Sequence, residues 1–484
     1  MVYPTDAMHK ISDQLNGLSE NQISQCVEGS RDGQQPDSAN RLLADYYRCP
    51  VNLVGFLPVS QSTQRPGYFQ IGPDTICYGG LSSGNTARSP VGKLYDALKH
   101  VGVEAQRIEL PFDAGEVVEN LRRERYTAHF RQEGRALNEI FRKVYYLIRP
   151  LLGVSTRRHL QKIRLRGWDE ISFPAWPVDF SVERVHRKLL ALSLRAQGLE
   201  KTPFIWFWPD GFSSCAIMTH DVEDRCGRDF CARLMDLDES FGIRSAFQVV
   251  PENRYSVTKG FLDSITTRGF EVNVHDLKHD GRLYADHAEF IRRAKRINGY
   301  AREFGAQGFR SGILYRNADW YDTFDFSYDM SIPNVAHLDP QRGGCCTVMP
   351  YFIGKIVELP VTCTQDYTLF QILGDYSIDL WKKQIDLVRE QHGLISFIVH
   401  PDYITEQRAQ DTYKALLGHL ARLRAEDGIW TALPRDVANW WRERSKMELV
   451  QENGEWRVEG PGKERARVAY ASLAGDAVTY SLAR

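Results

Sequence analysis

The sequence contains no long apolar run and no excess of charge of either sign. No stretch of its 484 residues approaches the roughly 18 apolar residues that a membrane-spanning helix needs. Its 61 lysine and arginine residues balance 62 aspartate and glutamate residues, which leaves a formal net charge of −1. Such a chain has no overall field that would attract nucleic acid or an anionic membrane. We therefore expect no nucleic-acid partner and no integral membrane segment.

The chain also lacks the cysteine spacing of a disulfide framework. It has nine cysteines, an odd number, and none of them form a CxxC pair. Reduced thiols in a cytoplasmic protein fit this pattern better than disulfide bridges do. Residues 1–40 are polar and contain no apolar segment of the kind found in a secretory signal peptide. These absences predict a cytoplasmic location, and nothing in the sequence indicates an oligomeric state.

Length and composition indicate a soluble globular protein with several domains. Hydrophobic residues make up 43% of the chain and charged residues 25%, as in ordinary globular proteins. A length of 484 residues suggests two or three domains. We predict a disordered tail at 1–40, an accessory α/β and helical region at 41–200, a larger α/β domain at 201–445 and a small β appendage at 446–484.

Two stretches allow more than one interpretation. Residues 134–166 are predicted to be helical and basic, and this face is either simply solvated or contacts an anionic glycan or lipid phosphate. Its basic residues include Arg149, Arg157, Arg158, Lys162, Arg164 and Arg166. Residues 203–211 are rich in aromatic side chains, which either line a sugar-binding cleft by stacking on pyranose rings or plug the bottom of a barrel. These side chains are Phe204, Trp206, Phe207 and Trp208.

Strand-like and helix-like segments alternate between residues 215 and 441. About seven or eight such βα units favour a parallel barrel over a long open sheet. The predicted fold class is α/β, a distorted (β/α)7-8 barrel with the accessory region before it and the β appendage after it. The predicted strands are Cys215–Thr219, Ser245–Val249, Glu271–Val274, Gly308–Arg310, Tyr328–Ser331, Val357–Pro360, Leu394–Val399 and Ile429–Thr431.

A cluster of charged side chains follows the first of these strands. The apolar stretch Cys215–Thr219 is followed by His220, Asp221, Glu223 and Asp224. Active sites of parallel α/β proteins form at the carboxyl ends of the strands. Carboxylates at such an edge are costly to hold unless a cation compensates for them. We therefore looked for cationic or metal-binding groups at the ends of the other strands.

Titratable or cationic side chains follow four further strands. His275 and His279 would lie on one face if the chain turned helical there, which suits joint presentation to a metal ion. Two imidazoles and one carboxylate form a metal-binding triad that leaves positions open for water and substrate. Arg310 can neutralise and orient a carboxylate through its planar guanidinium group. Asp329 is a second acid in a buried-looking strand, and His400 follows the apolar strand Leu394–Val399.

Taken in order, these features resemble the motifs of the polysaccharide deacetylase family. The resemblance covers residues 205–440, about half of the chain. Members of this family are metal-dependent carbohydrate esterases that remove N- or O-acetyl groups from glycans. The matching residues are Thr219, His220, Asp221, Val222 and Glu223 of the first motif, His275 and His279 of the second, Phe309 and Arg310 of the third, and His400 of the last.

The resemblance implies a role for each matched side chain. By that match Asp221 looks like the general base, with Arg310 as its charge partner, and His400 like the catalytic acid. The implied metal ligands are Glu223, His275 and His279. Zinc is the divalent ion we expect there.

The chain departs from the family's usual motifs at two places. The second of two adjacent aspartates is replaced here by Val222, so the match uses the acid-x-acid spacing of divergent members. The Arg-x-Pro motif is only half present, because Arg310 is followed by Ser311 and Gly312. Further candidate site residues are Asp224, as a competing metal ligand, His220 and Asp329.

The expected function is that of a metal-dependent deacetylase acting on an acetylated sugar, glycan or glycan precursor. A cytoplasmic enzyme would meet nucleotide sugars, lipid-linked intermediates or small amides rather than extracellular polymers. Two alternatives stay open. The same barrel could hydrolyse another C–N amide bond, or the chain could be an inactive member that only binds glycan.

Overall fold

The structure is a computed structural model that describes residues 38–50, 55–57, 65–127, 163 and 165–483. The predicted tail therefore lies almost wholly outside the described residues. The predicted basic stretch at 134–166 also lies almost wholly outside the described residues. Of its named basic residues only Arg166 is described, and the Arg166 side chain is exposed. The chain forms two compact units. One comprises Met1–Val117, Arg184–Phe204 and Ala469–Arg484, and the other comprises Val118–Glu183 and Ile205–Val468.

The second unit is built on a nine-stranded, mostly parallel sheet, with strand order β11-β12-β10-β9-β8-β7-β6-β13 and β14 also paired with β6. Only β11 runs antiparallel to its neighbour, and the sequence analysis did not predict this strand. The strands are β6 (Ser214–Val222), β7 (Ala246–Val249), β8 (Glu271–His275), β9 (Gly308–Arg310), β10 (Tyr328–Asp329), β11 (Tyr351–Ile353), β12 (Ile356–Glu358), β13 (Leu394–Val399) and β14 (Ile429–Thr431).

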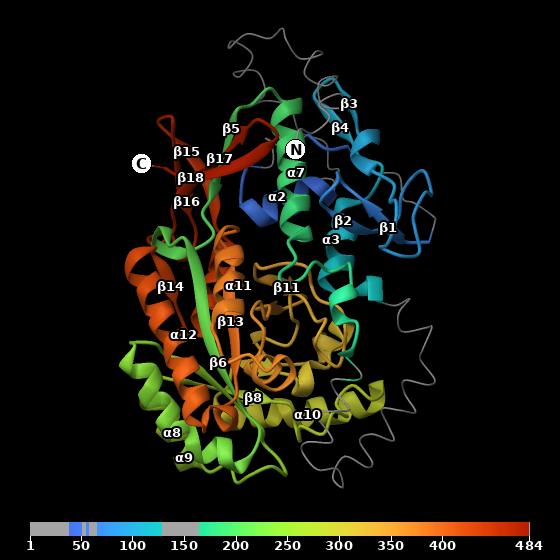
Figure 1. Ribbon diagram of the computed structural model, residues 1–484. Coiled ribbons are helices and arrows are strands. Elements are labelled where there is room, and N and C mark those ends of the chain that lie inside the picture. The colour runs from blue at the N-terminus through green and yellow to red at the C-terminus, as the bar shows by residue number, and fades with distance from the viewer. Residues whose placement is uncertain (1–37, 51–54, 58–64, 128–162, 164, 484) are drawn as a thin grey trace. The chain divides into compact units, whose positions relative to one another are not determined.

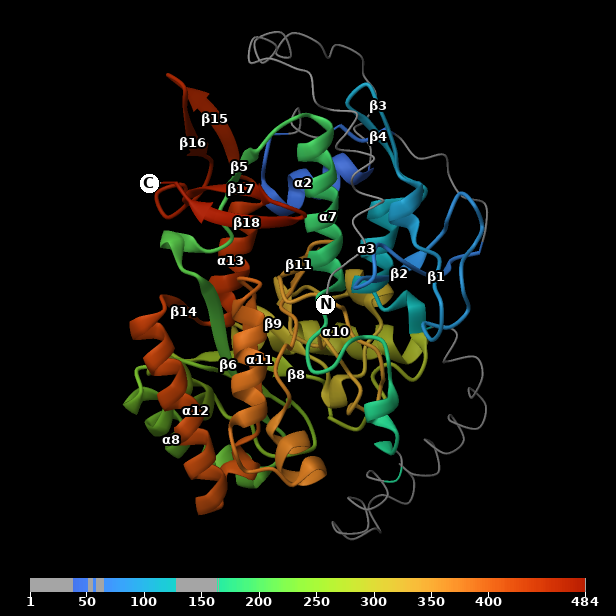
Figure 2. The same ribbon diagram turned by 45° about the horizontal axis from the view of Figure 1, so that its top comes forward.

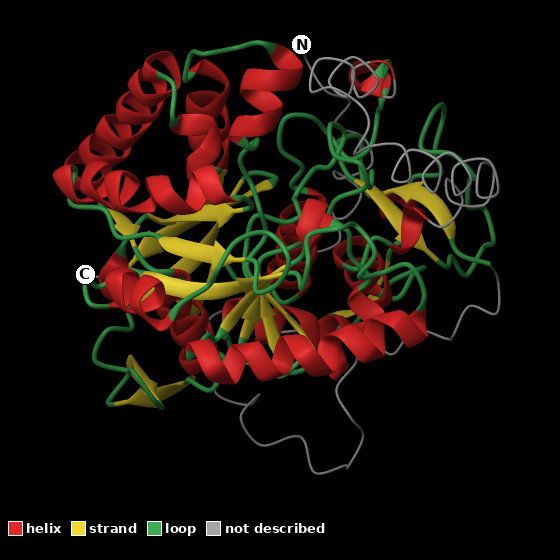
Figure 3. Cartoon of the chain, turned by 90° about the horizontal axis from the view of Figure 1, so that it is seen from below, coloured by secondary structure: helices red, strands yellow, loops and turns green. Residues whose placement is uncertain are grey.

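An irregular segment that follows β12, near one edge of this sheet, forms hydrogen bonds with β13 at the other edge. The backbone N–H of Cys363 donates to the Ser396 carbonyl on β13 at 3.1 Å. The backbone N–H of Ser396 donates to the Thr362 hydroxyl at 2.9 Å. The sheet is therefore curled into a distorted barrel (Figure 3), and the predicted α/β barrel class is confirmed.

Helices follow most of the parallel strands and pack on the outside of the sheet. Figure 1 shows α8, α11 and α12 in the neighbourhood of β6, β13 and β14. Outward-pointing strand residues such as Phe247, Val249 and Phe397 join these helices in one apolar core. The helices of this unit are α8 (Arg225–Ser240), α9 (Lys259–Thr266), α10 (His287–Phe304), α11 (Asp379–Arg389), α12 (Gln407–Glu426) and α13 (Pro434–Arg444).

The aromatic stretch after Ile205 is part of the core at the amino ends of the strands. Trp206 and Trp208 are 4% and 0% exposed. The Trp208 indole N–H donates to the carbonyl of His392, two residues before β13 begins, at 2.6 Å. The Trp206 indole donates to the Phe212 carbonyl at 2.8 Å, shortly before β6. These contacts support the barrel-plug interpretation for Trp206 and Trp208, and the sugar-cleft interpretation is wrong because all four aromatic side chains are buried.

The first unit contains small sheets and helices. Its helix α2 is Ser38–Tyr47, and most of α7 (Ser181–Ala196) belongs to it. Its two-stranded sheets are β1 (Gly67–Gln70) with β2 (Ile76–Gly79) and β3 (Gly102–Glu104) with β4 (Arg107–Glu109). Helix α3 (Ala114–Arg122) runs across the boundary between the two units.

The C-terminal residues form two β-hairpins, which agrees with the predicted β structure of this region. The first joins β15 (Glu448–Glu452) to β16 (Glu455–Glu459) through Asn453 and Gly454, whose φ angles of 53° and 83° suit a two-residue turn. The second joins β17 (Val468–Ala474) to β18 (Ala477–Leu482). Strand β17 also pairs with β5 (Lys201–Ile205), and Figure 2 shows these three strands together. The predicted appendage is thus divided between the two compact units, while the predicted domain boundaries remain a prediction.

Two further observations concern the described residues as a whole. The thiols of Cys215, Cys226, Cys231, Cys345, Cys346 and Cys363 are free, and all of these except Cys226 are buried. Within the same ranges, none of the helices has the length and apolar character needed to cross a membrane.

Candidate metal centre and active site

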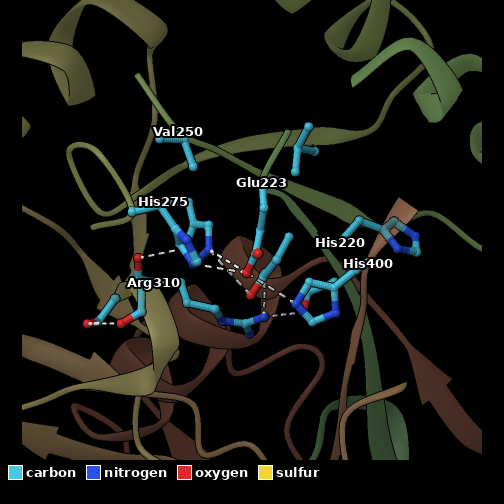
Figure 4. Close-up of polar contacts among 12 residues, drawn as sticks. His220, Glu223, Val250, His275, Arg310 and His400 are labelled. Atoms are coloured by element: carbon cyan, nitrogen blue, oxygen red, sulfur yellow. Dashed lines mark hydrogen bonds and ion pairs between the residues drawn. The ribbon is translucent and has the colours of Figure 1, made fainter. Parts of the chain in front are cut away.

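The site residues all lie at the carboxyl ends of neighbouring parallel strands of the second unit. Asp221 is the penultimate residue of β6, and Glu223 follows that strand directly. His275 ends β8, Arg310 ends β9, and His400 follows β13. Parallel strands bring their carboxyl ends to one edge, so residues as far apart in the chain as Glu223 and His400 meet there. Figure 4 shows Glu223, His275, Arg310 and His400 pointing toward one another, with His220 turned away.

Glu223, His275 and His279 form a compact group of potential metal ligands. One ligand atom of each lies within 4.8 Å of those of the other two. Glu223 Oε1 lies 2.9 Å from Nε2 of His279 and 3.9 Å from Nε2 of His275. Among the described residues, this is the one such group of three or more histidine, cysteine or acidic side chains.

A turn, and not a helix, brings His279 back to His275. Asp276 and His279 have positive φ angles of 54° and 51°, and no helix begins before His287. The helical arrangement that would place both histidines on one face is therefore not present, but the centroids of the two rings still lie 4.8 Å apart. Gly312 allows this turn to approach, because a Cβ there would lie 2.5 Å from Asp276 Oδ2 and 2.9 Å from His279 Cδ2.

The buried histidine nitrogens fit the binding of a divalent cation. The Nδ1 atom of His275 lies 3.1 Å from the Arg310 carbonyl, which suits an N–H at Nδ1 and leaves a lone pair on Nε2. The Nε2 atoms of both His275 and His279 are buried, and neither has hydrogen-bond geometry with a described residue, Glu223 included. One carboxylate and two imidazoles suit zinc or a similar divalent ion and leave coordination positions open.

The charges within this group keep Glu223 ionised. Burial by itself would raise the pKa of the Glu223 carboxyl, but the neighbouring imidazoles, His279 foremost, hold that pKa well below its usual value. Burial would lower the pKa of His275, but the charge of Asp221 raises it above its usual value. The carboxylate of Glu223 is 21% exposed, whereas His275 is 1% exposed, so the group faces solvent through Glu223.

Asp221 is held by Arg310 beside the ligand group. Arg310 Nη1 donates to Asp221 Oδ1 at 2.9 Å and to the Thr219 hydroxyl at 2.7 Å. Both residues of this ion pair are buried. Burial would raise the pKa of the Asp221 carboxyl, but the charge of Arg310, then those of His275 and His400, hold it below its usual value. Asp221 therefore carries a negative charge at neutral pH.

His400 is held by Asp366, a residue that the sequence analysis missed. Asp366 Oδ1 lies 2.6 Å from His400 Nδ1, and Asp366 Oδ2 accepts the backbone N–H of His400 at 2.8 Å. The opposite ring nitrogen, Nε2, lies 3.4 Å from Glu223 Oε1. Burial would lower the pKa of His400, but the charge and hydrogen bond of Asp366 hold it well above its usual value. Asp366 follows an irregular segment, so no strand pattern marked it in the sequence.

Three further candidate residues do not join this group. Asp224 caps α8, where its Oδ1 accepts the Gly227 N–H at 2.8 Å. His220 points to the helix side, with Nε2 3.0 Å from Asp238 Oδ2. Asp329 is buried beside Tyr321, whose hydroxyl donates to Asp329 Oδ1 at 3.1 Å. Asp221, Glu223, His275, His279, Arg310 and His400 are the predicted residues that the structure brings together.

No family model matches the sequence, and no curated protein does. Among solved structures, one similar protein is from Mycobacterium smegmatis and is described as a polysaccharide deacetylase; it is 20% identical, with a TM-score of 0.40 over 49% of this chain and 93% of that one. PuuE allantoinase is 13% identical, with a TM-score of 0.40 over 49% and 92% of the two chains. A family 4 acetyl xylan esterase from Clostridium thermocellum is 11% identical, with a TM-score of 0.32 over 47% and 91%. Each of these likenesses covers about half of this chain.

Proposed function

We propose that the chain is a metal-dependent hydrolase that removes an acetyl group from a sugar, a glycan or a glycan precursor. The observation that supports this most is the arrangement around Glu223, His275 and His279. Asp221, paired with Arg310, lies beside His275, and His400, paired with Asp366, lies beside Glu223. Hydrolysis of an acyl bond needs a base, an acid and an electrophile within reach of one carbonyl, and these groups supply them.

Glu223, His275 and His279 are the proposed ligands of the cation, with zinc as the expected ion. A divalent cation in such a site acts as a Lewis acid toward a carbonyl oxygen and lowers the pKa of water from about 15.7 toward about 7. The donation from Nδ1 of His275 to the Arg310 carbonyl keeps the ring oriented with Nε2 toward Glu223.

Asp221 is the proposed general base. Its Oδ1 is engaged by Arg310, and its Oδ2 lies 3.8 Å from Nε2 of His275, on the side of the ligand group. Oδ2 is therefore the oxygen that accepts a proton from the attacking water. The pairing with Arg310 keeps this carboxylate ionised and fixed in direction before the proton arrives.

His400 is the proposed acid, with Asp366 as the residue that holds it. Asp366 engages Nδ1, so Nε2 is the atom that faces the reacting bond and donates a proton to the leaving nitrogen or oxygen. Because Asp366 holds the pKa of His400 well above its usual value, the imidazole is protonated at neutral pH and ready to act as an acid.

The motif resemblance supports an acetylated carbohydrate as the substrate. The same set of base, acid and metal ligands could also hydrolyse another C–N amide bond. An inactive glycan-binding protein is the third possibility. The retained base, ligands and acid favour catalysis over this last one. A cytoplasmic location, which the sequence analysis expects, belongs to the same proposal.

Metal analysis and product release together test the proposal. We expect the purified protein to bind about one divalent ion and to release acetate from at least one member of a panel of acetylated sugars, nucleotide sugars and glycan oligomers. Hydrolysis of linear or cyclic amides without acetate release would favour the other C–N substrate. A protein that binds no divalent metal and has no activity would be the inactive glycan-binding form.

The variant Asp221→Asn tests the role of the base. We expect turnover to fall by about 1,000-fold or more, because a general base contributes 10²–10⁴-fold and the amide cannot accept the proton. Metal content should stay at the wild-type level. Asp224→Asn is the matched control, since asparagine also caps helices and should leave both readouts unchanged. Loss of metal from Asp221→Asn would contradict the base assignment, and loss from Asp224→Asn would make Asp224 a ligand.

A further inference from the structure

Gln248 of β7 points into the barrel beside Asp221. Alternate residues of a strand point to opposite faces, and its neighbours Phe247 and Val249 belong to the core between the sheet and the helices. Gln248 therefore faces the interior, where its side chain is 0% exposed. Neither its amide oxygen nor its amide nitrogen makes a hydrogen bond to any residue that the structure describes. Buried amides are normally satisfied, so this side chain calls for a partner.

Arg310 also has an unsatisfied atom in the same interior. Its Nε donates to the Met330 carbonyl at 2.9 Å, and its Nη1 donates to Thr219 and Asp221. Its Nη2 is buried and, within the described part of the chain, has no hydrogen-bond partner. A guanidinium group carries only donors, so Nη2 needs an acceptor.

The strand register places Gln248 next to the carboxylate that Arg310 holds. Asp221 on β6 is paired with Gln248 on β7, and paired residues of adjacent parallel strands point to the same face about 5 Å apart. Arg310 lies on β9 and reaches Asp221 on β6, while β8 and β7 lie between these strands in the sheet. Figure 4 shows the Arg310 guanidinium among the side chains of the site. The Gln248 amide oxygen lacks a donor among the described residues, and Arg310 Nη2 lacks an acceptor there. Both residues are neighbours of the Asp221 carboxylate.

We propose that Gln248 is a positioning residue for the base, acting on Arg310 through one ordered water. The Gln248 amide oxygen accepts a hydrogen bond from this water, and the water accepts one from Arg310 Nη2. A site with two such polar partners inside a barrel suits a buried water. With Nε, Nη1 and Nη2 all engaged, the guanidinium plane is fixed and Asp221 keeps its Oδ2 directed toward the ligand group. This inference rests on the proposed hydrolase function.

Two substitutions of Gln248 separate positioning from packing. Methionine has a similar length and no acceptor oxygen, whereas glutamate keeps the oxygen and adds a charge. We expect Gln248→Met to lower kcat by about tenfold, the effect typical of lost outer-shell partners, with KM and metal content unchanged. Gln248→Glu should retain more of the wild-type kcat than Gln248→Met does. A side chain that only fills space predicts the reverse order, because methionine packs well and a buried carboxylate does not.

Val249→Ala is the matched control for lost stability. Val249 is adjacent, equally buried and on the opposite face of β7, so its truncation should lower the unfolding temperature without lowering kcat. If Val249→Ala lowers kcat as much as Gln248→Met does, the positioning role is contradicted. The same conclusion follows if both Gln248 variants keep the wild-type kcat.

A high-resolution crystal structure of the wild-type protein gives a readout that does not depend on activity. We expect a water within hydrogen-bond distance of both the Gln248 amide and Arg310 Nη2. Density in which Nη2 is bound by another group, with Gln248 turned away, would overturn the inference. If no substrate of the panel is hydrolysed, the proposed function fails on its own, and this structure still decides whether Gln248 holds Arg310.

Discussion

At the scale of single residues, each buried charge of the site has a partner of opposite sign. Asp221 pairs with Arg310 and His400 pairs with Asp366, both inside the barrel end where exposure is 5% or less. Removing charges from water is costly, and such pairs often contribute little to net stability. Their value here lies in setting protonation states, since Arg310 keeps a carboxylate basic and Asp366 keeps an imidazole protonated.

The substitution Asp366→Asn tests how His400 is kept protonated. Asp366 raises the pKa of His400, so its removal should lower that pKa and shift the alkaline limb of the kcat–pH profile toward lower pH. The acid form of His400 is needed for turnover, so activity at pH 8 should fall more than activity at pH 6. The measurement is kcat between pH 5 and 9. Asp379→Asn, at an exposed position of α11, is the control, and an unshifted alkaline limb would contradict the role of Asp366.

At the scale of elements, the pair β10 and β12 carries two buried carboxyl groups that form no ion pair with any described residue. Asp329 is aligned with Glu358 in the register of these strands, and both are buried. Burial, followed by the charge of Asp329, raises the pKa of Glu358 well above its usual value. A carboxyl group whose pKa is higher in the folded chain than in the unfolded chain stabilises the fold at pH values below its pKa in the unfolded chain. This contribution is lost as the pH rises toward the folded pKa.

The substitution Glu358→Gln should therefore stabilise the protein at alkaline pH. Glutamine keeps an oxygen for the Ile332 N–H, which Glu358 Oε1 accepts at 2.9 Å, and offers an N–H toward Asp329. We expect a higher unfolding temperature than wild type at pH 8 and a difference that shrinks toward pH 5. Each unit by which the pKa is raised corresponds to about 1.4 kcal/mol. Thermal melts at pH 5, 6.5 and 8 measure this, with exposed Glu455→Gln as the control. A variant less stable than wild type at pH 8 would refute the expectation.

At the scale of the whole molecule, the candidate site lies within one compact unit. The unit that comprises Val118–Glu183 and Ile205–Val468 contains every residue proposed for the chemistry. The ligands come from the ends of β6 and β8, so a bound cation would connect two strands of the curled sheet. A ligand that binds only the folded chain stabilises it by mass action.

Removal of metal should lower the unfolding temperature. At a free metal concentration of about 100 times Kd, binding adds about 2.7 kcal/mol to the free energy of unfolding, and excess chelator removes this contribution. Calorimetry of the full chain with added zinc or with chelator measures the shift. His279→Gln should abolish the shift, whereas His287→Gln, at an exposed position at the start of α10, should preserve it. An equal shift in both variants would mean that the ion binds elsewhere.

The sequence predicted most of the barrel because its signals are local. Apolar runs such as Leu394–Val399 are typical of strands buried on both faces, and this run forms β13 with the same bounds. Residues after such strands reach one edge of the sheet whatever the details of the loops, which is why Glu223, His275 and His400 could be grouped beforehand. The turn at His279 was not predicted, because the tight approach of Gly312 that accompanies it involves a residue 33 positions away.

The strand pattern and the order of charged strand ends were thus determined by the sequence alone, since they depend on residues close together in the chain. Only the tertiary structure decided which side chain pairs with each charged group of the site. Asp366 meets His400 across 34 positions, and Arg310 meets Asp221 across 89. Whether a polar side chain faces the site or the helices also depends on tertiary packing. His220 turns to Asp238 on the helix side, while Asp221, the next residue, turns inward, because adjacent residues of a strand point to opposite faces.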